Sequence, residues 1–287
     1  MIYLDYNATT PCDPEVVEAM MPYFTQKFGN AASRTHPYGW IADEAVKQAR
    51  DKVAAMINAV PQEIVFTSGS TEGCNLALKG VFELYAAKGK HLITCATEHK
   101  AVLDTCRHLE RMGAEITYLG VDQDGLVDLN ELKAAIKQDT ILIAVMFANN
   151  ETGVIQPVEQ IGAIAHEHEV LFFTDATQAA GKCRIDVEAQ HIDILALSAH
   201  KFYGPKGVGA LYIRRRSPRV RLMAQIDGGG HERSFRSGTL NVPGIAGLGK
   251  AVELCGQNRE SESVRLRALR DHLEEGLLKL PGAKING

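Results

Sequence analysis

The sequence predicts an α/β fold in which helices cover both faces of a mostly parallel sheet. Strand and helix patterns alternate through most of the 287 residues. The runs Ile141–Val145 and Val170–Phe173 are apolar without alternation, as in strands that are buried on both faces. Ligands of such sheets bind beyond the carboxyl ends of the strands, so we expect the functional residues in the loops that follow them.

Each element rests on its hydrophobic period. In the helix predicted over 40–58, for example, Ala45, Ala49 and Val53 share one face. The predicted helices are 15–28, 40–58, 72–87, 100–112, 129–136, 158–167 and 259–280. The predicted strands are 62–66, 91–96, 115–119, 140–147, 171–174, 194–198 and 209–213. The last helix carries an apolar stripe that needs a packing partner, formed by Val264, Ala268, Leu273, Leu277 and Leu280.

Composition excludes several classes of protein. Hydrophobic residues make up 45% of the chain and charged residues 23%, which is ordinary for a globular protein. The formal net charge of −4 argues against nucleic-acid binding. We interpret the basic cluster of Arg214–Arg216, Arg219 and Arg221 as a solvated strand end. The sequence shows neither a membrane-spanning run nor a leader pattern, so we expect a cytoplasmic protein without membrane contact.

Cysteine and histidine spacing indicates no metal site. The cysteines are Cys12, Cys74, Cys95, Cys106, Cys183 and Cys255, and their spacing excludes zinc-ribbon and thioredoxin-type motifs. We interpret them as reduced, mostly buried structural thiols. His166 and His168 have no third ligand nearby in the sequence, so we interpret them as solvated helix residues.

The first segment with chemical potential is Thr67–Glu72, which lies between a strand and a helix start. Its small residues let backbone N–H groups approach an anion such as phosphate, with help from the helix dipole and the hydroxyls of Ser70 and Thr71. It lacks the Lys of a Walker loop and the spacing of a dinucleotide fingerprint. An ordinary helix start capped by Ser70 or Thr71 is the alternative.

Two further segments complete a pattern. Asp175 ends an apolar strand, with Gln178 three residues on, and can pair with a cationic ring nitrogen or cap a helix. Lys201 follows a nearly all-apolar strand within the Gly- and Pro-containing segment Ser198–Gly207. A lysine placed there can have a lowered pKa and form a Schiff base, although most lysines lie on the surface. An anion cradle, an acid and a lysine together indicate pyridoxal phosphate.

With these segments and four others, the sequence resembles the fold-type I pyridoxal-phosphate enzymes of the class V aminotransferase group. It is most similar to the cysteine desulfurases of the NifS/IscS type. The resemblance implies a three-layer cofactor domain with a mostly parallel central sheet and a smaller C-terminal α+β domain. The matching segments are Tyr3–Pro11, Thr67–Glu72, Thr97–His99, Asn149–Gly153, Thr174–Gln178, Ser198–Gly207 and Arg236–Leu240.

The resemblance implies roles around the cofactor ring. Lys201 would hold pyridoxal 5′-phosphate as a Schiff base and carry protons. Asp175 would keep the ring nitrogen protonated. Gln178 would hydrogen-bond the phenolic oxygen of the ring, with Asn150 nearby. His99 would stack on the ring face and act in proton transfer.

The resemblance also implies how the phosphate is held. Ser70, Thr71, Ser198 and His200 would bind it within one subunit. Thr239 would reach the phosphate of the neighbouring subunit, which implies a homodimer with shared sites.

The implied activity is removal of sulfur from L-cysteine, which gives L-alanine and an enzyme persulfide for iron–sulfur cluster assembly. The implied partners are L-cysteine, a second subunit and a sulfur acceptor or iron–sulfur scaffold protein. Selenocysteine lyase and aminotransferase activities are alternatives, because the same cofactor residues serve all three reactions.

The resemblance divides the chain into an N-terminal arm (1–13), a large cofactor domain (14–257) and the first helix of a truncated small domain (258–287). In the family, the attacking cysteine and an arginine that binds the substrate lie in the small domain. None of the six cysteines matches that catalytic position. We therefore expect little or no turnover by this chain alone, so that a cofactor-binding fragment is a third functional possibility.

Overall fold

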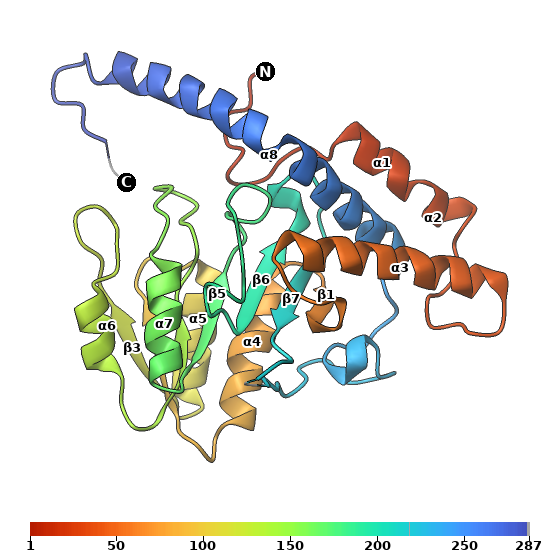
Figure 1. Cartoon of the computed structure of the whole chain (residues 1–287), viewed down its shortest axis with the longest axis horizontal. Coiled ribbons are helices and arrows are strands. Elements are labelled where there is room, and N and C mark those ends of the chain that lie inside the picture. The colour runs from red at the N-terminus through yellow and green to blue at the C-terminus, as the bar shows by residue number, and fades with distance from the viewer. Residues whose placement is uncertain (218, 286–287) are drawn as a thin grey trace.

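A seven-stranded sheet forms the middle of the computed structural model, which describes residues 1–217 and 219–285 (Figure 1). The strand order is β1-β7-β6-β5-β4-β2-β3. The strands are β1 (Ile64–Thr67), β2 (His91–Cys95), β3 (Glu115–Leu119), β4 (Thr140–Ala144), β5 (Leu171–Asp175), β6 (Ile194–Ser198) and β7 (Gly209–Ile213). The run from β3 to β6 is parallel, and β7 is antiparallel to both β6 and β1. The predicted mostly parallel sheet is confirmed.

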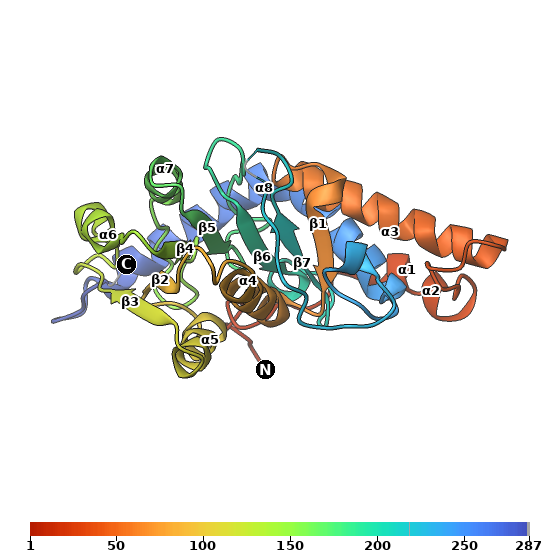
Figure 2. The same ribbon diagram turned by 90° about the horizontal axis from the view of Figure 1, so that it is seen from below.

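Helices cover both faces of this sheet (Figure 2). One face carries α4 (Ser70–Leu84) and α5 (Lys100–Arg111). The other carries α3 (Pro37–Met56), α6 (Leu129–Ala135), α7 (Val158–Glu167) and the first part of α8 (Val242–Leu277). Each face has its own apolar core. Phe172 and Phe173 of β5 lie in opposite cores, which explains why the strand shows no polar alternation.

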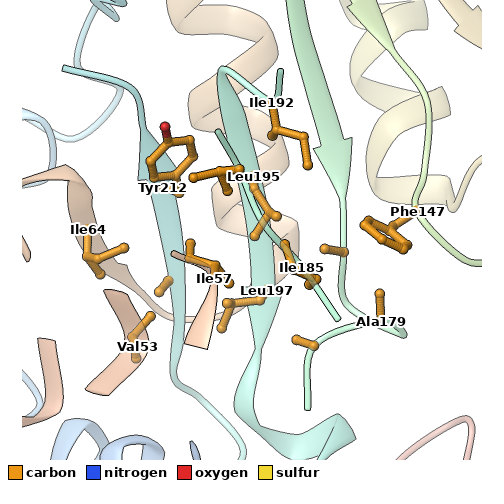
Figure 3. Packing of buried hydrophobic residues seen from close by; sticks show 14 of the residues in the cluster. Val53, Ile57, Ile64, Phe147, Ala179, Ile185, Ile192, Leu195, Leu197 and Tyr212 are labelled. Atoms are coloured by element: carbon orange, nitrogen blue, oxygen red, sulfur yellow. The ribbon is translucent and has the colours of Figure 1, made fainter. Parts of the chain in front are cut away.

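The core beneath α3 illustrates how the layers are held together (Figure 3). Val53 and Ile57 at the end of α3 pack in one cluster with Leu195 and Leu197 of β6 and Tyr212 of β7. All five are almost completely buried. Burial of each large apolar side chain contributes roughly 2 kcal/mol, so this layer resists any tilt of the strands that end at the site.

The helix predicted over 15–28 is two short helices, α1 (Pro14–Met20) and α2 (Pro22–Thr25). Pro22 has no N–H group to continue the first helix, and its fixed φ suits the start of the second. The proline was visible in the sequence, so this boundary could have been predicted.

The helix predicted over 259–280 begins much earlier, at Val242, and runs without a break to Leu277. Asn241 caps it by accepting a hydrogen bond from the N–H of Gly244. The glycines near its start lower helix propensity, but they allow close packing: a Cβ at Gly249 would lie 2.8 Å from the Cα of Ala49 on α3. The expected domain boundary at 257/258 therefore falls inside one continuous helix.

The two ends of α8 differ in their surroundings. Residues 242–252 are largely buried, whereas the predicted apolar stripe is exposed, with Val264 at 71% and Leu273 at 62%. The stripe thus has no cover among the described residues.

Arg214 corrects the interpretation of the basic cluster. Its side chain is only 7% exposed and pairs with Asp193 and Glu188 at 3.1 and 3.2 Å. Only the later arginines of the cluster, such as Arg216, are solvated. Within 1–217 and 219–285, we find no helix long and apolar enough to cross a bilayer and no trio of His, Cys, Asp or Glu side chains arranged for a metal ion.

Candidate active site

A cavity of about 900 Å³ opens where β1, β2, β4, β5 and β6 end. Its volume lies within the range typical of sites for small molecules. Of the predicted site residues, Ser70, Thr71, His99, Asn150, Asp175, Gln178, Ser198, His200 and Lys201 line this cavity. Thr239 does not line it; this residue is exposed on the segment before α8. The structure therefore brings together all the predicted residues except the one expected to serve a neighbouring subunit.

The start of α4 is an uncapped helix N-terminus that faces the cavity. Its N-cap is Gly69, and no side chain caps the first turn. The alternative of a helix capped by Ser70 or Thr71 is therefore wrong. The first N–H groups of α4 are left for an anion. Gly69 has a φ of 148°, and a Cβ there would come within 3.4 Å of the Ser198 hydroxyl, so glycine keeps this space open.

Asp175 lies at the end of β5, buried at the base of the cavity. Its Oδ1 accepts hydrogen bonds from the Ser70 hydroxyl at 3.0 Å and from the Thr177 N–H and hydroxyl at 3.0 and 2.5 Å. Its Oδ2 has only a long contact of 3.7 Å with the Cys74 thiol. Residues 177–182 form turns and no helix follows β5 directly, so helix capping does not explain Asp175. The arrangement fixes the carboxylate and leaves Oδ2 able to meet a cation.

Lys201 ends the short 3-10 turn that follows β6, and its side chain is half-buried. Burial lowers the pKa of Lys201, and the charges of Asp175 and Asp5 partly offset this effect. Its ammonium donates to the carbonyl oxygens of Asn7 and, at 2.9 Å, Ala8. The cavity therefore contains a lysine whose neutral form is favoured relative to a surface lysine.

The N-terminal arm closes one side of the cavity. The N–H and the hydroxyl of Thr10 each donate to the carbonyl of His200 at 2.9 Å, and the Thr9 hydroxyl lies 3.0 Å from Nδ1 of His200. Gln178 donates from Nε2 to the carbonyl of Asn7 at 2.9 Å. Burial is the main reason that the pKa of His200 is lowered, and the charges of Lys201 and Lys206 add to it.

Sequence reasoning missed several residues that line the cavity. Among them are Asp5, Asn7, Met146 and Lys206. The match of Tyr3–Pro11 to the family was a signal for the arm, but no local pattern showed that the arm lies against His200. Met146 and Lys206 lie within or beside matched segments and carry no distinctive pattern of their own.

His99 and Asn150 come from the loops after β2 and β4. His99 caps α5, because its Nδ1 accepts the N–H of Ala101 at 3.1 Å. The two loops are tied together by Asn149, which donates to the carbonyl of Thr97 at 3.1 Å, and by Glu98, which accepts the N–H of Met146. Complete burial raises the pKa of Glu98 well above its usual range. A network of side chains thus sets the wall that carries His99.

The six cysteines lie outside this cavity wall. Cys74, Cys95 and Cys106 are buried, whereas Cys12, Cys183 and Cys255 are half-buried, so the prediction of mostly buried thiols holds for three of them. Burial is the largest cause of a raised pKa at every one of them, to about 12 at Cys106 and about 11 at Cys255. All six therefore favour the protonated, weakly nucleophilic thiol.

Comparison with known proteins identifies the relatives of this chain. The model of the family described as aminotransferase class-V matches residues 2–287. A cysteine desulfurase IscS of Anaeromyxobacter sp. (strain K) is 60% identical over 287 residues, which is 100% of this chain and 71% of the relative. A cysteine desulfurase IscS of Dechloromonas aromatica (strain RCB) is 55% identical over 287 residues, again 100% of this chain and 71% of the relative.

Solved structures agree with these relatives. A NifS-like protein superimposes with a TM-score of 0.95 at 41% identity, covering 100% of this chain and 78% of its own. The protein SspA, solved in complex with cysteine, has a TM-score of 0.85 at 45% identity, covering 88% of this chain and 72% of its own.

Proposed function

Because the chain belongs to the class V aminotransferase family, we propose that it is a cysteine desulfurase that uses pyridoxal 5′-phosphate. It would take sulfur from L-cysteine and leave L-alanine. The relatives named cysteine desulfurase IscS and the cysteine complex of SspA support this substrate. The observation that carries the proposal is the single cavity in which Lys201, Asp175, His99 and the uncapped start of α4 meet.

The residues of the cavity fit the cofactor. The uncapped start of α4, beside Ser198 and His200, suits an anion. Oδ2 of Asp175, which has only a long contact with the Cys74 thiol, suits a cationic ring nitrogen, and Lys201 suits an aldehyde. When bound, pyridoxal phosphate supplies an aldehyde for amines and a ring that withdraws electrons from the substrate's Cα.

Lys201 would serve as both anchor and proton carrier. Its lowered pKa makes the neutral amine accessible at lower pH than for an ordinary lysine, and the neutral amine is the nucleophile. Once released from its anchoring role, the same nitrogen can accept a proton and deliver it again.

The other residues would orient the ring. Asp175, held by three donors on Oδ1, would keep a proton on the ring nitrogen. His99 would stack on one face of the ring. Its Nδ1 accepts the N–H of Ala101 at the start of α5, so Nε2 is the nitrogen that would assist proton transfer in the cavity. Gln178 would hydrogen-bond the phenolic oxygen of the ring, and Asn150 would lie near it.

The phosphate would lie at the start of α4. Thr71, Ser198 and His200 would offer side chains, whereas Ser70 would offer its backbone N–H because its hydroxyl already donates to Asp175. Thr239, which is exposed, would reach the phosphate of a second subunit, so the protein would act as a homodimer.

The wider proposals rest on the family resemblance. They comprise an arm (1–13), a cofactor domain (14–257) and a small domain that starts at 258, with the exposed stripe of α8 inside it. They also comprise a cytoplasmic location, an iron–sulfur role and a partner protein that accepts sulfur. Burial raises the pKa of all six thiols, which disfavours the thiolate that would accept sulfur.

The test of the proposal is titration with pyridoxal 5′-phosphate, read as the visible absorbance of a Schiff base. We expect a band for the wild type, none for Lys201→Ala, and an unchanged band for Lys206→Ala, a second lysine of the same cavity. With L-cysteine, alanine and sulfide would support desulfuration, whereas a keto acid would indicate an aminotransferase. A wild-type spectrum that the cofactor leaves unchanged would refute the proposal.

A further inference from the structure

The 226–240 loop, between β7 and α8, supports the cradle (Thr67–Glu72) from two sides. Glu232 contacts Phe66, the residue before the cradle, and Arg236 contacts Glu72, its last residue. Neither residue lines the cofactor cavity. Their contacts therefore act on the shape of the cradle and not on a ligand inside it.

The first contact is a buried ion pair. Glu232 accepts from Nη1 and Nη2 of Arg50 at 2.8 and 2.6 Å and from the N–H of Phe66 at 2.7 Å. Its side chain is 2% exposed. A buried carboxylate with three donors is rigid, since moving it would leave a charge unpaired. Phe66 lies on β1, so this contact fixes the strand that leads into the cradle.

The second contact lies on the other side. Arg236 donates from Nε and Nη2 to the two carboxylate oxygens of Glu72 at 2.8 and 3.3 Å. Glu72 also accepts the N–H of Ser68 at 2.8 Å, so one carboxylate connects the loop, the cradle and the first turn of α4. A second cavity of about 360 Å³ lies beside this pair, lined in part by Phe235 and Gln225. This space leaves less packing around the ion pair on that side of the cradle.

The backbone of the loop is strained between the two contacts. Glu232, Arg233 and Ser234 have φ values of 48°, 57° and 68°, although none of them is glycine. The left-handed region costs such residues roughly 1 kcal/mol or more each, and strain of this kind persists only where the surroundings enforce it. Here Glu232 is held by Arg50, and Arg233 donates to the carbonyl of Ile64, so two contacts fix this backbone.

We propose that Glu232 and Arg236 are positioning residues that hold the cradle in its anion-binding shape. The inference rests on the proposed function, in which the cradle receives the phosphate of the cofactor. N–H groups that are already held in place bind an anion without the entropy cost of ordering the loop. Loosening either end of the cradle therefore weakens binding of the phosphate. It leaves the reaction of Lys201 with an aldehyde intact.

The experiment compares pyridoxal 5′-phosphate with pyridoxal, which has the same aldehyde and ring but no phosphate. Dissociation constants for both are measured by Schiff-base absorbance in the wild type, Arg236→Met and Glu232→Gln. In the variants we expect about tenfold weaker binding of pyridoxal 5′-phosphate and unchanged binding of pyridoxal. A loss of this size is typical when a residue that orients the ligand-binding groups is removed. Arg236→Lys is expected to recover part of the loss.

The matched control is Arg265→Met, which removes a bidentate pair with Glu262 on the exposed part of α8. Its affinity for either aldehyde is expected to equal that of the wild type. Equal weakening of both aldehydes in Arg236→Met would show general damage and overturn the inference, as would unchanged affinity in both loop variants. Should Arg236→Met fold poorly in a melting curve, Arg236→Gln, which removes the charge and keeps a polar side chain, carries the same comparison.

Inorganic phosphate, measured by calorimetry, separates this inference from the proposed function. If the wild type binds phosphate more tightly than Arg236→Met does but forms no Schiff base, the positioning role stands and the proposed function falls. If phosphate binds the wild type and the variant equally, or binds neither, the positioning role is wrong.

Discussion

The cofactor cavity and the six cysteine sites have opposite character, although both lie around the same sheet. The cavity is open and lined with polar groups, and its lysine has a pKa that burial lowers toward the reactive neutral form. Burial also dominates at the cysteines, but it raises their pKa values and so disfavours the reactive thiolate. The same physical effect therefore activates an amine and silences a thiol.

The difference separates two parts of a desulfurase reaction. The described chain contains the residues expected to bind and orient the cofactor, but its own thiols are poor acceptors for the sulfur that would be released. The sequence spans 71% of the length of its relative from Anaeromyxobacter sp. (strain K). The first three predictions below test whether the cavity and the thiols differ as strongly as the structure indicates.

Thiol reactivity is where the largest effect is expected. Cys255, with a pKa raised to about 11 from 9.0, has about a hundredfold less thiolate near neutral pH than an ordinary cysteine. Alkylation of the folded protein, followed site by site by mass spectrometry, is expected to be slower than in urea by at least that factor at Cys255 and Cys106. Rapid labelling at either site would contradict the claim that burial suppresses the thiolate there.

Asp175→Asn is expected to weaken binding of pyridoxal 5′-phosphate by about tenfold, because a charge-assisted hydrogen bond to the ring nitrogen is lost while the shape of the side chain is kept. Titration of the Schiff-base absorbance measures the change. Thr177→Val, which removes one donor to Oδ1, is the control and should cost less. Wild-type affinity and an unchanged spectrum in Asp175→Asn would show that Asp175 does not bind the ring nitrogen.

The rate of cofactor attachment is expected to rise with pH, with a midpoint below 10.5, the ordinary value for lysine. Only the neutral amine reacts, and burial lowers the pKa of Lys201 in the folded protein. Asp175 and Asp5 oppose this shift, so Asp5→Asn should move the midpoint further down. Stopped-flow absorbance across pH is the measurement, and a midpoint at or above the ordinary value would contradict the assignment.

The smallest effect is expected at the anchor of α8 near Cys255. Glu253 pairs with Lys52 of α3 and with Lys250, and hydrogen bonds from these two lysines lower its pKa to about 2. Glu253→Gln is expected to cost about 0.5 kcal/mol of unfolding free energy, as for other partly exposed pairs.

The pH dependence of that cost has a definite sign. Because the pKa of Glu253 is depressed in the folded state, its contribution is complete above 4.5 and is lost as the pH falls toward about 2. Urea unfolding at several pH values measures both the size and the sign. A difference between wild type and variant that grows as the pH falls would have the wrong sign for this anchor.

The sequence was sufficient for the sheet and for expecting most of the candidate site residues around one cavity. Strand ends that share one edge of a parallel sheet meet in space, so the sequence alone indicates that Lys201, Asp175 and the start of α4 lie close together. Strands that are buried on both faces, such as β5, can also be predicted because their residues are apolar without polar alternation.

Other features depended on contacts that leave no local trace. Arg50 and Glu232 are 182 residues apart, and no spacing rule connects them. The first part of α8 was not predicted; glycines lower helix propensity there, whereas in the fold Gly249 allows close approach to Ala49 on α3. The N-terminal arm was matched as a motif, but its position against His200 follows from long-range hydrogen bonds.

The most direct test of the account is to locate the attached cofactor. The protein is incubated with pyridoxal 5′-phosphate, reduced with borohydride and digested, and the modified residue is identified by mass spectrometry. The account predicts a single pyridoxyl adduct on Lys201, absent from Lys201→Ala and retained in Lys206→Ala. An adduct mainly on Lys206 or Lys182, or no adduct in the wild type, would contradict it.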